Sequence, residues 1–397
     1  MTHGITRRTA VGRLAAGGLA AGLAGGLLPG TASAARGRRV VAGTYAAEGG
    51  EGLYRLGHDA ATGRWTLAPP IAAIRNASFA VRDGHGRWYA LDESDGGRVT
   101  AYGPGWRVLG SAPSGGAGPC HLALDRAGRC LAVANYGGGS VGLVQLDRRE
   151  GVGGRPAVFA HAGSGPNAER QAGPHAHWVG FSPDQRWLHA VDLGADTIFA
   201  YGFDPRTRTL APPQPAWRAP AGAGPRHLAR HPRLPVAYVV CELSNQLMML
   251  EVLADGRFAT RATLSTLPAG FAGASQVAHV AIDRTGQRLY VSNRGHNSIA
   301  VFVIEADGTP RPVQHVDSGG DWPRMFLLVE DARQMLVGNE RSGTVAVLGI
   351  ARDGTLTGVS GTGGSGTAGS GTTGSGTGGD ATGQLLTVPG VAFLGLD

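Results

Sequence analysis

Short apolar stretches recur along this chain and are separated by polar turns. Each copy of the pattern has an apolar strand, a turn such as Asp-x-x-Gly-Arg, a second apolar strand that ends in Asn or Asp, a polar turn and an alternating strand. The clearest copies begin at His121, His177 and Val280, and weaker copies begin at Phe79, His227 and Phe326. Because apolar alternation with a period of two is typical of half-buried strands, the pattern predicts an all-β repeat protein.

The end of the second strand is the clearest landmark in each copy. It falls at Asp92, Asn135, Asp192, Cys241, Asn293 and Asn339, and at Thr44 in a truncated first copy. The seven copies are spaced by roughly 42–57 residues, which is within the range of propeller blades. The first copy lacks its early strands, and the C-terminal stretch QLLTVPGVAFL can supply one. We therefore predict a seven-bladed β-propeller closed by N- and C-terminal strands.

Two segments fall outside the repeats. Residues 1–35 contain a twin-arginine pair, Arg7-Arg8, then an Ala/Gly/Leu-rich run and the small residues Ala32-Ser33-Ala34. They predict a twin-arginine signal peptide and export to the cell envelope or the medium. The alternative, a short membrane anchor, is disfavoured because the run is short and rich in Gly. Residues 36–397 would form the propeller, and the Gly/Ser/Thr-rich residues 358–383 are predicted to be a disordered insertion within the closing blade.

Charge and cysteine content exclude some functions. The formal net charge is +7, but six arginines and no acidic residue precede Val40, and three of these arginines lie in the predicted signal peptide, so the exported chain is only mildly basic. Since no basic stripe is interleaved with aromatic residues, we expect no nucleic-acid partner. The three cysteines form no disulfide framework. We expect a monomer that does not associate with the membrane once the signal peptide is removed.

Ionisable residues gather in equivalent positions of the repeats. In a propeller blade the start of the innermost strand and the end of the second strand share one mouth of the central channel. Aligning the copies brings to this mouth His121, Tyr136, His175, His177, Arg226, His227, Glu242, His279, Arg294 and Arg324. A structural protein needs no such residues there, because buried charges cost desolvation energy unless they are paired or bind a ligand.

These residue types favour chemistry on an anion. Guanidinium groups bind carboxylates and phosphates in a fork, and an arginine can also stabilise an oxyanion. His177 and Glu242 are candidate general bases. Neighbouring arginines disfavour a metal cation at His175, His177 and Glu242, and the sequence has no dinucleotide fingerprint or phosphate-binding glycine loop. We therefore predict neither a metal ion nor a cofactor.

Several stretches resemble the lactonase family of seven-bladed propellers, which includes propeller-type 6-phosphogluconolactonases and fungal carboxymuconate lactonizing enzymes. The matching stretches are GPCH from Gly118, GSGPNAERQAGPHAH from Gly163, GPRH from Gly224, CELSN from Cys241, VSNRGH from Val291 and WPR from Trp322. The resemblance implies a metal-independent site made of His177 (or His175), Arg226, Glu242 and Arg294. It also implies that the arginines hold an anionic sugar lactone while Glu242 or His177 activates water. His121, Tyr136, His175, His227, His279 and Arg324 would complete the substrate-binding surface.

The sequence leaves three functions open. The first is a hydrolase that opens an anionic or sugar lactone, with the lactone or its sugar acid as the only partner. The second is a binding or scaffold propeller that keeps the polar mouth without chemistry. The third is a muconate-type cycloisomerase. His279 and Met325 stand where an acid and a polar residue are usual in the family, so they change the charge of the predicted pocket.

Overall fold

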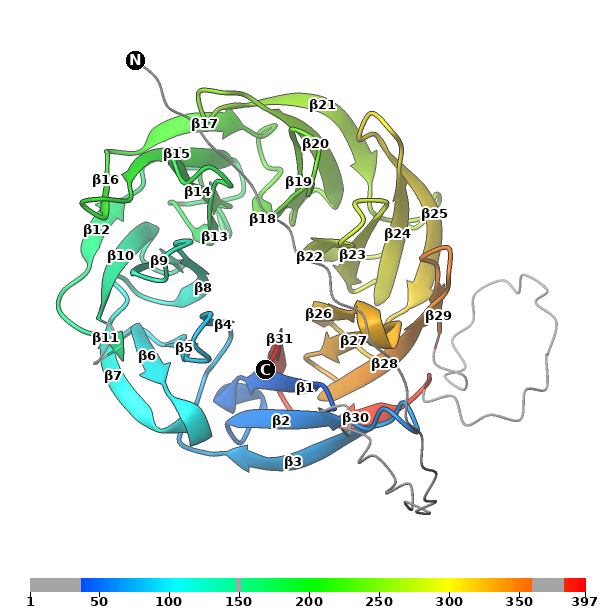
Figure 1. The fold of residues 1–397 in the computed structure, drawn as a ribbon. Helices are drawn as coiled ribbons and strands as arrows, with labels where there is room; N and C mark the ends of the chain where they lie inside the picture. The colour runs from blue at the N-terminus through cyan, green and yellow to red at the C-terminus, as the bar shows by residue number, and fades with distance from the viewer. Residues whose placement is uncertain (1–36, 148–150, 359–381) are drawn as a thin grey trace, which may run out of the picture. The chain divides into compact units, whose positions relative to one another are not determined.

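Seven antiparallel sheets surround a common axis in the computed structural model of this chain (Figure 1). The structure describes residues 37–147, 151–358 and 382–397. The predicted signal peptide and most of the Gly-rich insertion lie outside the described residues. The described part contains only three short 3-10 helices, and none of its helices is long and apolar enough to cross a membrane. The prediction of an all-β, seven-bladed propeller is confirmed.

We number the blades 1 to 7 in chain order and give the strands of each blade in the same order. Blade 1 contains β1 (Arg39–Thr44), β2 (Leu53–His58), β3 (Trp65–Ile71) and β31 (Val391–Leu396). Blade 2 contains β4 (Ala80–Arg82), β5 (Trp88–Asp92), β6 (Arg98–Tyr102) and β7 (Val108–Pro113). Blade 3 contains β8 (Pro119–Leu124), β9 (Cys130–Asn135), β10 (Ser140–Asp147), β11 (Gly151–Val152) and β12 (Ala157–Ala160).

The remaining four blades follow the same plan. Blade 4 contains β13 (Ala176–Phe181), β14 (Trp187–Asp192), β15 (Thr197–Asp204), β16 (Thr209–Leu210) and β17 (Gln214–Arg218). Blade 5 contains β18 (Pro225–Arg230), β19 (Val236–Cys241), β20 (Gln246–Val252) and β21 (Phe258–Ser265). Blade 6 contains β22 (Gln276–Ile282), β23 (Arg288–Arg294), β24 (Ser298–Ile304) and β25 (Pro310–Asp317). Blade 7 contains β26 (Pro323–Val329), β27 (Gln334–Asn339), β28 (Thr344–Ile350), β29 (Leu356–Thr357) and β30 (Leu385–Thr387). The helices are η1 (Ala46–Glu48), η2 (Pro104–Trp106) and η3 (Glu330–Ala332).

Blade 1 closes the ring by joining the two ends of the described chain. Its inner strand β31 pairs with β1 in an antiparallel register that sets Ala42 opposite Leu394. The C-terminal stretch was expected to supply one strand, but it supplies two, because β30 pairs with β28 in blade 7. The strands on either side of the Gly-rich insertion, β29 and β30, both pair with β28 in blade 7.

The repeated Asp-x-x-Gly turn explains why the first two strands form a hairpin. In blade 3 the Oδ1 atom of Asp125 accepts hydrogen bonds from the main-chain N–H groups of Arg129 and Cys130, at 2.6 and 2.8 Å. Gly128 has a φ of 61°, a left-handed conformation that glycine adopts without a steric penalty. In blade 6 Asp283 accepts the equivalent bonds from Gln287 and Arg288. The aspartate thus satisfies donors that the turn leaves unpaired.

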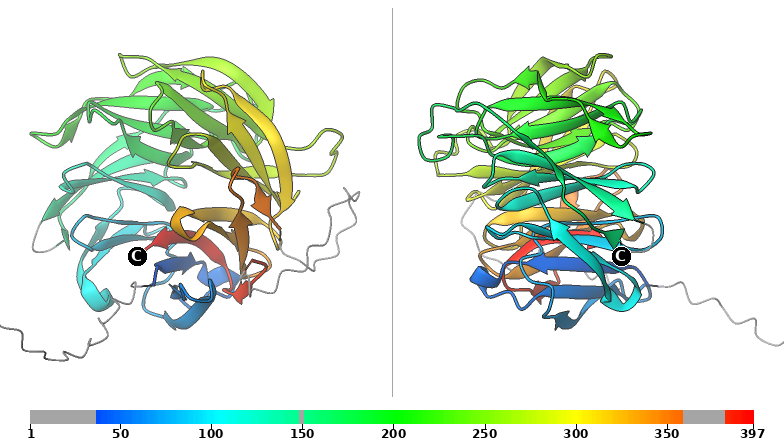
Figure 2. Two further views of the ribbon diagram at one scale, coloured as in Figure 1. Left: turned by 45° about the vertical axis from the view of Figure 1, so that its right-hand side comes forward. Right: turned by 90° about the vertical axis from the view of Figure 1, so that its left-hand side faces the viewer.

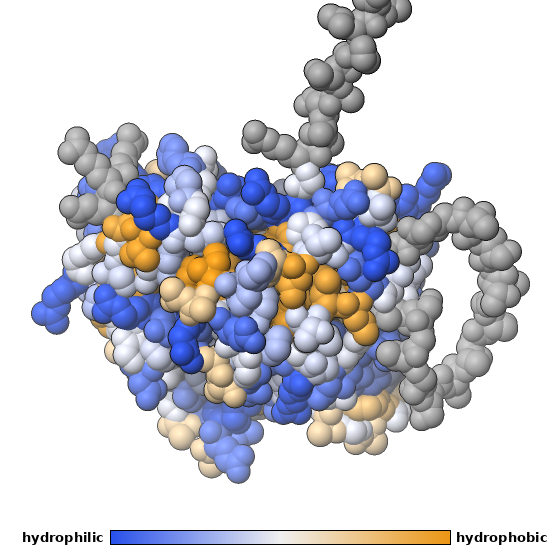
Figure 3. Space-filling view, turned by 90° about the horizontal axis from the view of Figure 1, so that it is seen from below, coloured by the Kyte–Doolittle hydropathy of each residue, from blue (hydrophilic) through white to orange (hydrophobic). Residues whose placement is uncertain are grey.

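The apolar core lies between neighbouring blades. Between blades 2 and 3, for example, Tyr89 and Leu91 pack in one buried cluster with Leu131 and Val133. Seen from the side, the blades stack sheet against sheet around the ring (Figure 2). On the face drawn in Figure 3, hydrophobic residues form small groups surrounded by hydrophilic ones. Burial between blades rigidly fixes the strand ends, and these ends carry the polar mouth.

Candidate active site

The predicted landmark residues lie where the repeat alignment placed them. Strands β1, β5, β9, β14, β19 and β27 end at Thr44, Asp92, Asn135, Asp192, Cys241 and Asn339, whereas β23 runs one residue past Asn293. Buried asparagines at this position are anchored, as when Asn135 Nδ2 donates to Ser140 Oγ at 3.2 Å. The residue that follows each landmark, or ends β23, is thereby placed at one mouth of the channel. Glu242 and Arg294 are two of these residues.

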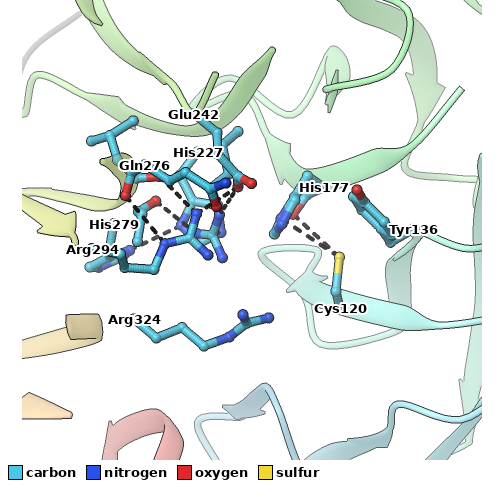
Figure 4. Close-up of polar contacts among 12 residues, drawn as sticks. Cys120, Tyr136, His177, His227, Glu242, Gln276, His279, Arg294 and Arg324 are labelled. Carbon is cyan, nitrogen blue, oxygen red and sulfur yellow. Dashed lines mark hydrogen bonds and ion pairs between the residues drawn. The ribbon is translucent and has the colours of Figure 1, made fainter. Parts of the chain in front are cut away.

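Glu242 is the centre of a buried cluster of guanidinium groups (Figure 4). Its Oε2 atom lies 2.9 Å from Arg226 Nε and 2.9 Å from Arg294 Nη2, and its Oε1 atom lies 2.7 Å from Arg170 Nη2. Burial by itself would raise the pKa of Glu242, but Arg294 and Arg226 outweigh it, and the pKa falls well below its usual range. Glu242 is therefore an anion held by three cations.

Arg226 and Arg294 are also bound to main-chain carbonyl oxygens. Arg226 Nη1 donates to Ala278 O at 2.7 Å, and Arg294 Nη2 donates to Val277 O at 3.1 Å. Burial, followed by the charge of Arg294, lowers the pKa of Arg226 to about 9, which still leaves it cationic at neutral pH. These bonds fix both guanidinium planes beside Glu242.

Arg170 was not among the predicted site residues. It lies on the connection between β12 and β13, outside the repeating strands, and its Nη2 atom donates to Tyr136 OH at 3.2 Å as well as to Glu242. The connection is anchored by Gln171, a fully buried residue whose Nε2 atom donates to Leu193 O at 2.9 Å. A repeat alignment cannot place a loop residue. The only sequence signal was its position within the GSGPNAERQAGPHAH stretch.

His177, on β13, lies inside the channel, whereas His175 lies at its rim. The ring of His177 contacts those of His227 and Tyr136, with centroids 5.4 and 5.3 Å apart, and its Nδ1 atom is 3.8 Å from Cys120 Sγ. His175 precedes β13, stacks on Tyr136 at 4.4 Å and donates from Nδ1 to the carbonyl of Tyr136. Burial, then the charge of Arg226, lowers the pKa of His177 well below its usual value, so the imidazole is neutral.

Three further predicted histidines form a layer of imidazole rings on the inner strands of blades 3, 5 and 6. His121 and His227 lie with ring centroids 5.5 Å apart, and His227 Nδ1 lies 3.0 Å from His279 Nδ1. Because Arg226 Nη1 donates to His227 Nε2, at 3.1 Å, the neutral His227 carries its proton on Nδ1 and donates it to His279. Burial lowers the pKa of all three, and with the charge of Arg226 it brings that of His279 to about 3.

Arg324 belongs to a second group of charges at the mouth. Its Nη2 atom donates to Tyr45 OH at 2.7 Å, and Tyr45 donates to Glu93 Oε2 at 2.7 Å. Glu340 completes the group, with Oε2 at 3.4 Å from Arg324 Nη1. Burial raises the pKa of Glu93 although Arg324 opposes the shift. Tyr45, Glu93 and Glu340 directly follow β1, β5 and β27, which is the repeat position of Glu242, but they were not among the predicted site residues.

The described residues contain no group of three or more His, Cys, Asp or Glu side chains arranged to hold a metal ion. A groove of about 640 Å³ between blades 1 and 2 lies at the opposite ends of the strands, lined by residues that include Arg39, Trp88 and Trp106. That groove contains none of the predicted site residues. The concentration of charge and of neutral imidazoles at the other mouth remains the better candidate for an active site.

The fold and this mouth define the protein as a seven-bladed β-propeller with an arginine- and histidine-rich site at one end of its channel. The chain belongs to the family described as Lactonase, 7-bladed beta-propeller, whose sequence profile matches residues 39–368. The family resemblance inferred from the sequence motifs is thus confirmed.

Individual relatives agree with this assignment. A 6-phosphogluconolactonase of Bacillus subtilis is 33% identical over 322 residues, which cover 77% of this chain and 89% of that protein. An uncharacterized protein of Lactococcus lactis subsp. cremoris is 31% identical over 317 residues, which cover 78% of this chain and 91% of that protein. Among solved structures, the periplasmic gluconolactonase PpgL of Pseudomonas aeruginosa aligns with a TM-score of 0.77 and 26% identity, over 90% of this chain and 98% of that one.

Proposed function

We propose that this protein is a hydrolase that opens a sugar lactone to the corresponding hydroxy acid. The observation that carries the proposal is the cluster of Arg226, Glu242 and Arg294 beside the neutral His177, at the channel mouth of a chain in the lactonase family. The 6-phosphogluconolactonase and gluconolactonase among its relatives support a cyclic sugar ester as the substrate class.

His177 suits the role of general base better than Glu242. The described residues offer no hydrogen-bond partner to His177 Nε2, so its lone pair is available to a water molecule, whereas both oxygens of Glu242 are bound to guanidinium groups. In the proposed reaction His177 takes a proton from water as the water oxygen bonds to the lactone carbonyl carbon. An arginine stabilises the oxyanion, the ring C–O bond breaks, and the leaving oxygen takes the proton back from His177. Glu242 keeps the arginines in place.

The charge of the mouth favours a substrate with little negative charge. Four guanidinium groups face three carboxylates, Glu93, Glu242 and Glu340, so most of their charge is already compensated. A sugar lactone with at most one anionic group fits this balance.

We propose further that residues 1–35 direct export by the twin-arginine route, which agrees with the periplasmic location named for the Pseudomonas structure. A reporter fused to these residues should be exported, and Arg7→Lys with Arg8→Lys should stop the export. Export that continues through the general secretory route in this double variant would contradict the proposal.

The function is tested with residues 36–397 and a panel of glucono-1,5-lactone, its 6-phosphate, a homoserine lactone and an aliphatic lactone, followed by pH-stat. We expect turnover of at least one sugar lactone, and its loss in Arg226→Ala. A folded protein that hydrolyses none of the panel, yet binds a sugar acid, would be a binding propeller. Loss of absorbance from a muconate would instead identify a cycloisomerase.

A further inference from the structure

The four guanidinium groups at the mouth differ in the contacts they would lose on turning to a ligand. Arg226 and Arg294 have side chains only 3% and 5% exposed. Both donate to carbonyl oxygens of the segment from Gln276 to Ala278. If either turned away, buried carbonyl groups would lose their donors, which is costly in a dry site. Both are therefore fixed parts of the site.

Arg324 is held almost as firmly. It donates to Tyr45 OH, pairs with Glu340, and lies over the ring of Tyr45 with its guanidinium carbon 5.1 Å from the ring centroid. Since Tyr45 in turn donates to Glu93, movement of Arg324 would also disturb the hydrogen bond that Glu93 accepts. Arg324 has more partners to lose than a surface arginine has.

Arg170 is the exception. Its side chain is 31% exposed, and both of its hydrogen-bond partners, Tyr136 OH and Glu242 Oε1, are side-chain atoms within the mouth. If Arg170 released Glu242, the carboxylate would keep Arg226 and Arg294, each at 2.9 Å. The next residue, Gln171, holds the loop in place, so the side chain of Arg170 can turn while its main chain stays fixed.

We propose that Arg170 is the specificity-determining residue that binds an anionic group on the substrate, a carboxylate or phosphate remote from the lactone ester. The inference rests on the proposed function and names the side chain that selects the substrate class. A carboxylate or phosphate oxygen replaces Glu242 Oε1 as the acceptor of Arg170, and the fork geometry of guanidinium suits both groups. Tyr136 OH, released by Arg170, provides a second donor beside it.

The test compares matched lactones in the wild type, Arg170→Gln and Arg170→Lys. The lactones are glucono-1,5-lactone, which is neutral, its 6-phosphate, and the monolactone of glucaric acid, which carries a carboxylate. In Arg170→Gln we expect the ratio of kcat/KM for a charged lactone to that for the neutral one to fall about tenfold or more, mainly through KM. Arg170→Lys should recover part of the ratio. Comparison of the phosphate-bearing and the carboxylate-bearing lactone shows which anion the Arg170 side chain selects.

The control variant is Arg261→Gln, which removes an exposed guanidinium paired with Glu251 at the outer edge of blade 5. It should leave the ratio unchanged. If Arg170→Gln lowers kcat/KM for charged and neutral lactones by the same factor, Arg170 only supports Glu242 and the inference is wrong.

Binding measurements separate this inference from the proposed function. Isothermal titration with glucarate, as an anionic sugar acid, should give at least tenfold weaker binding to Arg170→Gln than to the wild type or to Arg261→Gln. This result would support the role of Arg170 in anion binding even if no lactone were hydrolysed, in which case only the proposed function would fail. Equal affinities, or no binding of glucarate to the wild type, would overturn the inference.

Discussion

The carboxylate of Glu242 and the guanidinium of Arg294 form an ion pair 2.9 Å long in which both side chains are almost completely buried. The two residues come from neighbouring blades, since Glu242 follows β19 and Arg294 ends β23. A pair of this kind gives little net stability, because both charges lose their hydration. Its effect is to fix the positions of charges at the mouth, and to make the loss of either partner costly.

Glu242→Gln should therefore destabilise the protein by about 3–5 kcal/mol, because three cations would face an uncharged amide in a buried site. The measurement is the free energy of unfolding from urea titration. Glu251→Gln is the control, since its pair with Arg261 is exposed and should be worth less than about 1 kcal/mol. Equal effects of the two substitutions would show that the cluster is hydrated in solution.

The layer of neutral imidazoles predicts a loss of stability in acid. His279 has a folded-state pKa of about 3, while an unfolded histidine titrates near about 6.5. Below a pH of about 6.5 the unfolded chain therefore binds more protons than the folded one. Each such histidine thus removes up to about 1.4 kcal/mol of stability per pH unit as the pH falls from about 6.5 toward the folded-state pKa.

Urea midpoints measured from pH 7.5 to pH 4.5 check this slope. His279→Gln should make it shallower, because one of the groups that takes up a proton on unfolding is gone. A midpoint that stays constant between pH 7 and pH 5 in the wild type would mean that the histidines are already protonated or hydrated in the folded protein.

His177 and His175 can be separated by activity on whichever lactone is turned over. His177→Gln should lower kcat by about 10²–10⁴-fold, the range expected when a general base is lost. His175→Gln should have a much smaller effect, because this ring is stacked on Tyr136 and bonded to its main-chain carbonyl. The opposite order of the two effects would assign the base to His175.

Asp192 offers a test of how the mouth is supported in blade 4, where it occupies the position that asparagine has in blades 3, 6 and 7. Its Oδ1 atom accepts from the N–H groups of His175 and Ala195, and its Oδ2 atom accepts from His161 Nδ1 at 2.6 Å. Asp192→Asn should cost only about 1–2 kcal/mol, because the new amide keeps an acceptor for the two main-chain N–H groups and can donate to Nδ1 of His161 when the ring proton is on Nε2.

Asp192→Ala should cost more, about 3–5 kcal/mol, since it strands the buried His161 and two main-chain donors. Both values come from urea titration at neutral pH. Equal costs for the two substitutions would mean that the charge of Asp192, rather than its hydrogen bonds, stabilises blade 4.

The sequence by itself determined the number of blades and which repeat positions lie at the mouth, because both follow from the period of the repeat. Alternating apolar residues must be buried on a sheet face, and the Asp-x-x-Gly turn and terminal asparagine mark strand ends within about one residue. The sequence predicted that the C-terminal stretch closes the ring, as β31 does, but it did not predict β30, which belongs to a different blade and is separated from β31 by three residues. Short strands of this kind carry too little pattern to show which partner they pair with.

Only the tertiary structure decided how the mouth residues interact. Repeat position places Glu242, Arg226 and Arg294 near one another, but it cannot show that Glu242 is surrounded by cations and so is a poor base. It also could not find Arg170, which reaches the cluster from a loop with no counterpart in the repeat. The pKa of a side chain and the reach of a loop depend on distances across blades, and these distances are set by packing between segments far apart in the chain.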